Sequence, residues 1–357
     1  MAFRNFKMVG YVVYGRGSFN QLEEIIAPHR KHGQPMIFLI DHFFDGKTLP
    51  DRIPVNGNDK IIFADVTYEP KTTYVDSLAK QLKVEFGSVS GIIGIGGGST
   101  LDLAKAVSLM MNNPGSSADY QGWDLVKNAG VYKVGIPTLS GTGAEVSRTT
   151  VLTGPEKKLG MNSDFTPFDQ IVLDPELTAA APANQRFYTG MDCYIHCIES
   201  LEGTYLNEFS KSYGEKALQL CRDVFVSKHE WDDDCDDKLM MASYAGGMSI
   251  AYSQVGVAHA VSYGLSYLLG TKHGIGNCIV MNQIEEYYPA GVKEFKYMVE
   301  KNKIEIPIGI CRGLSDDDFD KMINVSLGMK PLWENALGSD WEKIMTKEKL
   351  RRLYEKL

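Results

Sequence analysis

The first half of the chain alternates short apolar runs with longer stretches in which apolar residues recur every three or four positions. The short runs predict buried strands, and the longer stretches predict amphipathic helices. This alternation is typical of a parallel sheet with helices on both faces. The predicted strands are residues 11–14, 36–40, 61–63, 90–95 and 134–136, with a last strand ending near residue 175. The predicted helices are residues 20–27, 72–86 and a segment that begins near residue 100.

The pattern changes near residue 177, after which one helical stretch follows another. The predicted helices of this half are residues 190–201, 207–226, 238–251, 259–268 and 278–287. An acidic tract at residues 232–237 predicts a solvated loop between two of them. We therefore predict an α/β domain over residues 1–176 and an all-helical domain over residues 177–357.

Length and composition support this division and exclude several classes of protein. The 357 residues exceed the roughly 250–300 that one core supports, so two domains are expected. The net charge of −8 and the absence of a lysine or arginine run argue against a nucleic-acid partner. No apolar stretch reaches the ~18 residues of a membrane span, and the N-terminus lacks the pattern of a signal peptide. The six cysteines lack disulfide or metal-site spacing, which favours packing roles in a reducing compartment. We expect a soluble, cytoplasmic protein.

A glycine loop joins a predicted strand directly to a predicted helix at Gly96, Gly97, Gly98 and Ser99. Backbone N–H groups at the start of a helix, without Cβ atoms in the way, form a favourable site for a phosphate group. The spacing matches neither GxGxxG nor the P-loop, so a tight turn without a ligand is the alternative. Its place between strand and helix favours phosphate binding.

Two further features suit a nucleotide. Asp41 follows a predicted strand, where an acidic residue commonly binds ribose hydroxyls. A carboxylate there repels a 2′-phosphate, which favours NAD over NADP; a solvated loop aspartate is the alternative. A second loop, residues 137–143, supplies hydroxyl groups and two glycines after strand 134–136.

Asp192 and His196 lie four residues apart in a predicted helix, so both side chains project from one face. A carboxylate and an imidazole in an apolar segment are costly to bury unless they are paired. A divalent ion would pair them, and His259 and His273 could complete its coordination. One carboxylate and three imidazoles suit iron(II) or zinc. A simple Asp–His hydrogen bond in the core is the alternative. Cys193 lies about a quarter turn away and is interpreted as a packing residue.

The motifs of this chain, in this order and spacing, are Gly97-Gly98-Ser99 with Asp102 and Lys105, Asp192-xxx-His196, and His259 fourteen residues before His273-Gly274. They resemble the iron-containing (group III) alcohol dehydrogenase family, and the resemblance covers essentially the whole chain. It implies a Rossmann-like dinucleotide-binding domain followed by an all-helical domain, the architecture of dehydroquinate synthase. It also implies a metal in the cleft between the domains and a homodimer.

The resemblance implies roles for individual residues. It assigns the metal, iron(II) or alternatively zinc, to Asp192, His196, His259 and His273. It assigns NAD contacts to Asp41, Gly97, Gly98, Ser99, Asp102, Thr138, Ser140, Thr142 and Lys158.

Two residues are predicted to act in catalysis or substrate binding. Many family members carry a histidine four residues after the third metal ligand, where this chain has Tyr263. The phenol of Tyr263 could replace that histidine in a proton relay if its pKa were lowered. Arg148 is the candidate anchor for a substrate carboxylate, with a surface or interdomain arginine as the alternative.

The expected activity is the metal-dependent oxidation of a CH–OH group. Within the family, stretches 120–124, 188–209 and 246–256 most resemble the members that act on a sugar acid, and this resemblance implies 3-deoxy-D-manno-octulosonate as substrate. Its terminal C8 alcohol would become the aldehyde used for an 8-amino sugar of lipopolysaccharide, with NAD or oxygen as the final acceptor. The first alternative is a general NAD(P)-dependent alcohol dehydrogenase or aldehyde reductase acting on a small alcohol. The others are a dehydroquinate synthase-like lyase and a metal-stabilised binding protein.

Overall fold

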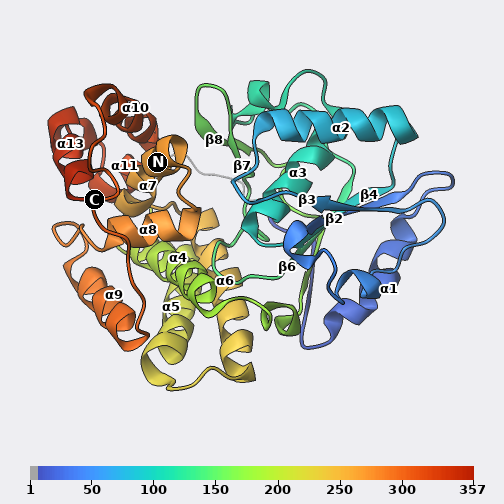
Figure 1. The fold of residues 1–357 in the computed structure, drawn as a ribbon, viewed down its shortest axis with the longest axis horizontal. Coiled ribbons are helices and arrows are strands. Elements are labelled where there is room, and N and C mark those ends of the chain that lie inside the picture. The colour runs from blue at the N-terminus through green and yellow to red at the C-terminus, as the bar shows by residue number, and fades with distance from the viewer. Residues whose placement is uncertain (1–6) are drawn as a thin grey trace. The chain divides into compact units, whose positions relative to one another are not determined.

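The computed structural model describes residues 7–357, which divide into two compact units. The first unit contains the chain up to Leu139 and Ala144–Ala180; the second contains Ser140–Gly143 and Ala181–Leu357. The described strands all belong to the first unit, and the second is helical (Figure 1). The predicted fold class, an α/β unit followed by a helical one, is confirmed. The predicted boundary after residue 176 lies within a 3-10 helix, Pro175–Thr178, shortly before the chain enters the second unit.

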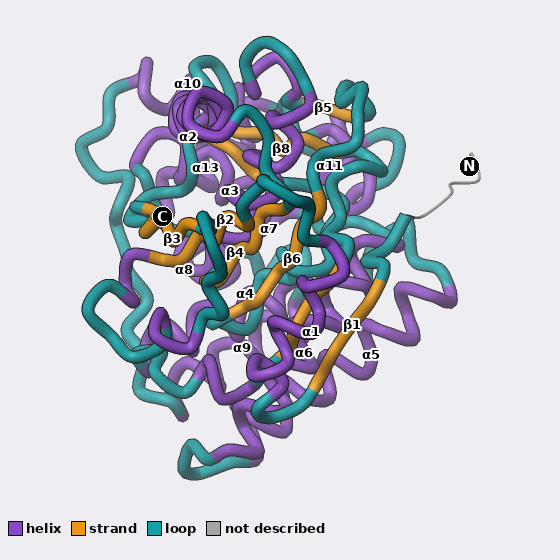
Figure 2. The backbone as a smooth tube through the Cα atoms, turned by 90° about the vertical axis from the view of Figure 1, so that its right-hand side faces the viewer, coloured by secondary structure: helices purple, strands orange, loops and turns teal. Residues whose placement is uncertain are grey.

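The first unit is built on a six-stranded sheet in the order β1-β9-β6-β4-β2-β3, and its neighbouring strands pair in parallel. Figure 2 shows β1, β6, β4, β2 and β3 following one another across this unit. The inner strands are buried along nearly their whole length, which explains their unbroken apolar runs. The strands are β1 (Tyr11–Tyr14), β2 (Met36–Asp41), β3 (Lys60–Ala64), β4 (Gly91–Gly96), β6 (Tyr132–Pro137) and β9 (Gln170–Leu173).

Helices cover both faces of this sheet. Helix α1 (Leu22–Ile26) packs in one apolar cluster with alternate residues of the inner strands, among them Phe38 and Ile95. On the other face, α3 (Gly98–Asn112) packs against β4 and β6, and α2 (Thr72–Phe86) packs against α3. The predicted helix 72–86 is confirmed, whereas the predicted helix 20–27 is shorter because 3-10 turns flank α1.

A second, three-stranded sheet was not predicted from the sequence. It consists of β5 (Gly122–Trp123), β8 (Lys158–Asn162) and β7 (Val151–Thr153), in that order. Two of these strands have only two or three residues, too few to produce a recognisable periodicity.

The second unit is assembled around α4 (Ala183–Leu201), whose residues from Thr189 to Ser200 are buried on every side. Helix α4 packs against α5, α6 and α8. The helices of this unit after α4 are α5 (Glu208–Arg222), α6 (Asp233–Tyr252), α7 (Val257–Leu269), α8 (His273–Met281), α9 (Pro289–Lys301), α10 (Asp316–Leu327), α11 (Lys330–Leu337), α12 (Trp341–Ile344) and α13 (Lys347–Lys356).

Two predictions for this unit were wrong. The predicted helix 278–287 begins earlier, at His273, and ends at Met281. The acidic tract 232–237 is not a loop: Asp232 caps α6 by accepting a hydrogen bond from the Cys235 N–H (3.0 Å), and the other acidic residues lie in the first turns. Acidic side chains are stabilising there because the N-terminal end of a helix carries a partial positive charge.

The segment Ser140–Gly143 joins the second unit because its glycines allow close backbone approach. At Gly141 the φ angle is +149°, and a Cβ atom would lie 1.7 Å from the carbonyl oxygen of Thr189. At Gly143 a Cβ atom would lie 2.5 Å from the Cα of Gly247. The two glycines are therefore required for packing within this unit.

All six cysteines are buried and unpaired, in agreement with packing roles. Within the described residues, no helix is long and apolar enough to cross a membrane.

Candidate functional site

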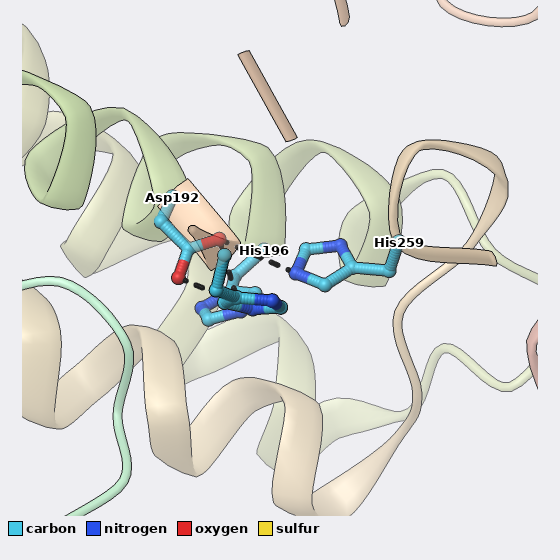
Figure 3. A group of neighbouring side chains, drawn as sticks. Asp192, His196 and His259 are labelled. Carbon is cyan, nitrogen blue, oxygen red and sulfur yellow. Dashed lines mark ion pairs between the residues drawn. The ribbon is translucent and has the colours of Figure 1, made fainter. Parts of the chain in front are cut away.

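The four predicted metal ligands converge in the second unit, where one ligand atom from each lies within 4.8 Å of the others. Asp192 and His196 come from one face of α4, as their spacing predicted, and His259 comes from the first turn of α7. Figure 3 shows the rings of His196 and His259 turned toward the Asp192 carboxylate. His273 is the first residue of α8, so three helices supply the set.

The separations between these atoms suit a common ion. Nε2 of His259 and Nε2 of His196 lie 3.4 and 3.8 Å from Oδ1 of Asp192, and Nε2 of His273 lies 3.5 Å from Oδ2. Ligands at about 2.0–2.2 Å from a tetrahedral ion are separated by about 3.3–3.6 Å. Asp192 Oδ2 is buried and has no hydrogen-bond partner among the described residues, a costly state that an ion would relieve. The donor set therefore fits a divalent metal.

Burial and the neighbouring charges shift the pKa values of three of the four ligands. Burial alone would raise the pKa of Asp192, but the imidazoles of His273, His196 and His259 outweigh burial and hold this pKa well below its usual range. Burial lowers the pKa of His196 to about 3, so its ring is neutral at pH 7, as a metal ligand must be. Burial also lowers the pKa of His259, but Glu199 and Asp192 reverse this effect and raise it to about 9.

Two polar residues that the sequence reasoning missed contact the ligands. Glu199 lies on α4 and its Oε2 is 2.5 Å from Nδ1 of His259. Asn277 lies on α8, and its Nδ2 donates to Oδ1 of Asp192 at 2.6 Å. Both follow a ligand by helical spacing, Glu199 three residues after His196 and Asn277 four residues after His273. This spacing in the sequence is the feature from which the two residues could have been predicted to lie beside the ligands.

Only one of the four ligand side chains is appreciably exposed to solvent. The side chains of Asp192, His196 and His259 are at most 2% exposed, whereas His273 is 25% exposed. The ring of Tyr263, also on α7, packs edge-on against His273 with the ring centroids 6.2 Å apart. Tyr263 thus lies next to the accessible ligand.

In the first unit, the predicted phosphate loop forms the junction between β4 and α3. Gly97 is the N-cap residue of α3, so Gly98 and Ser99 lie in its first turn. Asp41, at the end of β2, lies against the same junction, because a Cβ atom on Gly96 would be 3.0 Å from Cβ of Asp41. Thr138 follows β6, and its backbone N–H donates to the Gly96 carbonyl at 2.9 Å. These predicted residues therefore gather at the carboxyl ends of three adjacent strands.

Asp102 and Lys105, on the next turns of α3, form a buried ion pair at 3.7 Å. Burial raises the pKa of Asp102 to about 7 and lowers the pKa of Lys105 to about 8. Asp102 Oδ2 accepts a hydrogen bond from the Val151 N–H, but Oδ1 has no hydrogen-bond partner among the described residues.

The other residues predicted to contact the nucleotide are divided between the two units. Lys158 is buried in the first unit and forms an ion pair with Glu69. Ser140 and Thr142 belong to the second unit, and Ser140 Oγ is a buried atom without a hydrogen-bond partner in the described chain.

Arg148 is already paired within the first unit. Its Nε donates to Asp164 at 2.8 Å and its Nη2 donates to Asp124 at 2.5 Å. A substrate carboxylate would have to compete with these two aspartates.

Comparison with known proteins identifies both units. The family model described as iron-containing alcohol dehydrogenase matches residues 10–175, and the model of the C-terminal region of the same family matches residues 186–306. Sulfoacetaldehyde reductase from Bilophila wadsworthia is 29% identical over 273 residues, 75% of this chain and 67% of the relative. NAD-dependent methanol dehydrogenase from Bacillus methanolicus is 28% identical over 291 residues, 78% of this chain and 74% of the relative.

A solved structure shares the fold over nearly the full length. Sulfoacetaldehyde reductase from Bifidobacterium kashiwanohense, in complex with NAD+, has a TM-score of 0.80 at 21% sequence identity, covering 99% of this chain and 98% of its own.

Proposed function

Because the chain belongs to the iron-containing alcohol dehydrogenase family, we propose that it interconverts a small primary alcohol and its aldehyde, with NAD as the hydride carrier. It is an oxidoreductase acting on CH–OH groups. The observation that carries the proposal is the cluster of one carboxylate and three imidazoles around an unpartnered oxygen of Asp192.

Asp192, His196, His259 and His273 would hold the ion, with iron(II) as the expected metal and zinc as the alternative. A divalent ion supplies Lewis acidity, which makes a substrate hydroxyl easier to deprotonate. The burial of the first three side chains excludes water from most of the cluster. His273 is the exposed member, so the substrate is expected to approach on its side.

The α3 N-terminus would bind the pyrophosphate of NAD, through Gly97, Gly98 and Ser99. Asp41 supports a ribose contact because it lies beside this turn, and its negative charge disfavours NADP. Asp102 would make a further contact through Oδ1, which accepts no hydrogen bond from the described residues and lies 3.7 Å from Nζ of Lys105. The roles of Thr138, Ser140, Thr142 and Lys158 stay predictions.

We propose that Tyr263 passes the hydroxyl proton away from the site. Its ring packs on His273, the accessible ligand, and it replaces the histidine common in the family. Tyr263→Phe should lower kcat by about 10²-fold and leave the metal content unchanged, since proton transfer by a positioned side chain contributes at least that much. Tyr267→Phe, on the same helix, is the matched control. An unchanged kcat in Tyr263→Phe would exclude the relay.

The second candidate is oxidation of the C8 alcohol of 3-deoxy-D-manno-octulosonate. It rests on the sequence stretches 120–124, 188–209 and 246–256. Three relatives favour small substrates, since their names are those of enzymes for sulfoacetaldehyde, methanol and 1-propanol, whereas another is named a long-chain-alcohol dehydrogenase.

A substrate screen separates the candidates. Protein loaded with iron(II) is assayed for NADH formation with short primary alcohols, for NADH consumption with their aldehydes, and for aldehyde formation from the octulosonate with NAD or oxygen. Turnover of the short substrates with much higher kcat/KM supports the first candidate, and selective turnover of the octulosonate supports the second. Conversion of a substrate without net NADH formation and without oxygen consumption would indicate a lyase instead.

Arg148 is the proposed carboxylate anchor for the sugar acid, although its pairing with Asp124 and Asp164 favours a structural role. Arg148→Ala should raise KM for the sugar acid and leave KM for a neutral alcohol unchanged. An equal effect on the KM of both substrates would indicate that Arg148 has a structural role and does not bind the carboxylate.

We also infer a homodimer. Strand β1 pairs only with β9 among the described strands, and its exposed edge carries Tyr11 (74% exposed) and Tyr14 (49% exposed). Exposed apolar edge strands are prone to pair with another chain. Light scattering should give the mass of a dimer for the wild type and that of a monomer for the Tyr11→Lys/Tyr14→Lys variant. A monomeric wild type would refute the inference.

A further inference from the structure

The carboxylate of Glu199 is fully buried, and each of its oxygens has one partner on α7. Oε2 is 2.5 Å from Nδ1 of His259, and Oε1 accepts a hydrogen bond from the backbone N–H of Ala258 at 2.5 Å. Glu199 therefore holds two consecutive residues at the start of α7, where a negative charge also interacts favourably with the helix dipole.

These contacts determine which nitrogen of the His259 ring carries a proton and how the ring is oriented. A carboxylate can only accept hydrogen bonds, so Nδ1 of His259 must carry the proton. The nitrogen left to bind an ion, once it carries no proton, is Nε2, which lies 3.4 Å from Oδ1 of Asp192 and 2.9 Å from Nδ2 of Asn277. A ring flip would break the contact with Glu199, so both the tautomer and the orientation needed for metal binding are fixed before an ion arrives.

His196 lacks this support at the corresponding ring nitrogen. Nδ1 of His196 is buried and has no hydrogen-bond partner among the described residues. The two ligands nevertheless stack, with ring centroids 4.7 Å apart. Within this pair, only His259 has a charged partner at Nδ1.

We propose that Glu199 is a positioning residue of the metal centre, which sets the metal affinity by holding His259 without touching the ion. The proposal rests on the metal-dependent function proposed above. α4 would thus supply two ligands, Asp192 and His196, together with the carboxylate that aligns a third ligand on α7.

The test is a metal titration of protein stripped with a chelator. Cobalt(II) is the probe, since its visible spectrum reports the geometry of the ligands, and a chromophoric chelator provides the competition for affinity. Glu199→Gln should bind cobalt(II) about 10–100-fold more weakly than the wild type, with a changed spectrum. The two contacts of Glu199 are made by different oxygens, and in the amide one of these positions is an NH2 group, which cannot accept a hydrogen bond.

Asp236→Asn is the matched control. Asp236 is a buried carboxylate of the same unit that accepts from Nε1 of Trp231 at 2.8 Å. Loss of the Asp236 carboxylate should lower the melting temperature of the metal-free protein. The increase in melting temperature caused by cobalt(II) should stay the same as in the wild type. In Glu199→Gln that cobalt-dependent increase should shrink, because a weaker ligand stabilises less at the same concentration.

Glu199→Asp covers the case in which Glu199→Gln does not fold. The shorter side chain keeps the charge but cannot reach both partners, so cobalt(II) affinity should again fall. Wild-type affinity and an unchanged spectrum in whichever variant folds would overturn the proposal. Failure of the wild type itself to bind cobalt(II), zinc or iron(II) would instead refute the proposed function.

Discussion

The metal cluster of the helical unit and the glycine turn of the α/β unit are both suited to hold a small ligand, but they are built from different parts. The cluster consists of side chains aimed by buried polar partners, as Glu199 aims His259 and Asn277 contacts Asp192. The glycine turn consists of backbone, and what matters at Gly96 is the absence of a side chain. The side-chain functional groups therefore determine what the cluster can bind, whereas the path of the backbone determines what the turn can bind.

This difference predicts different responses to substitution. Removing a ligand atom from the cluster should abolish its chemistry while the surrounding helices stay folded, since α4 is held by packing along its whole buried length. Adding an atom to the turn should disturb the strand–helix junction itself. The three predictions below test this contrast, from the largest expected effect to the smallest.

Asp192→Ala should abolish metal binding and lower kcat/KM by at least about 10³-fold. The carboxylate is the only anionic ligand of the four, and loss of a Lewis acid removes several kcal/mol of transition-state stabilisation. Metal analysis and steady-state rates provide the measurement, and NAD affinity should be unchanged. Asp236→Asn again serves as the control. Stoichiometric metal in Asp192→Ala would show that the three imidazoles suffice and that Asp192 is not a required ligand.

Gly96→Ala should destabilise the protein by about 1–3 kcal/mol and weaken NAD binding, with no change in metal content. The added Cβ atom would lie 2.5 Å from Oγ1 of Thr100 and 3.0 Å from Cβ of Asp41, and Thr100 is fully buried. Urea unfolding and calorimetric NAD titration are the measurements.

Gly97→Ala provides the internal control for this prediction. The nearest atom to its Cβ would be Cδ1 of Leu139 at 3.1 Å, the end of a flexible side chain. Its effect on the free energy of unfolding should stay within about 0.5 kcal/mol. Equal destabilisation by both substitutions would contradict the argument that backbone clearance at Gly96 shapes this turn.

The same contrast explains what could be predicted from the sequence. The ligands Asp192 and His196 were recognisable because helical spacing places i and i+4 on one face regardless of the rest of the fold. The inner strands were recognisable because burial on both faces requires unbroken apolar runs. Both signals are local to one element.

What could not be predicted depends on contacts between elements. Glu199 was missed because its role depends on α7, which lies about sixty residues further along the chain. The pairing of Arg148 with two aspartates, 16 and 24 residues away, could not be predicted because such separations leave no local pattern. The acidic tract was interpreted as a loop because composition indicates solvation equally for a loop and for the first turn of a helix.

The smallest predicted effect concerns the buried pair Asp102–Lys105, which follows the glycine turn. It is a change in how the free energy of unfolding depends on pH. Burial raises the pKa of Asp102 to about 7, from an ordinary value of 3.8. A raised folded-state pKa means that its stabilising contribution is fully present below pH 3.8 and is lost as the pH rises through about 7. Asp102→Asn removes this titration, so the wild type should lose stability relative to the variant over this window.

We expect a relative change of about 1 kcal/mol between pH 4.5 and 7.5, because partial exposure of the Asp102 side chain and its attraction to Lys105 reduce the full linkage effect. Urea unfolding of the metal-free protein at several pH values gives the difference directly. Asp45→Asn, at an exposed position of the same unit, should leave the pH profile unchanged. A difference between wild type and Asp102→Asn that is constant with pH would mean that the carboxylate is ionised throughout, and that Lys105 compensates fully for its burial.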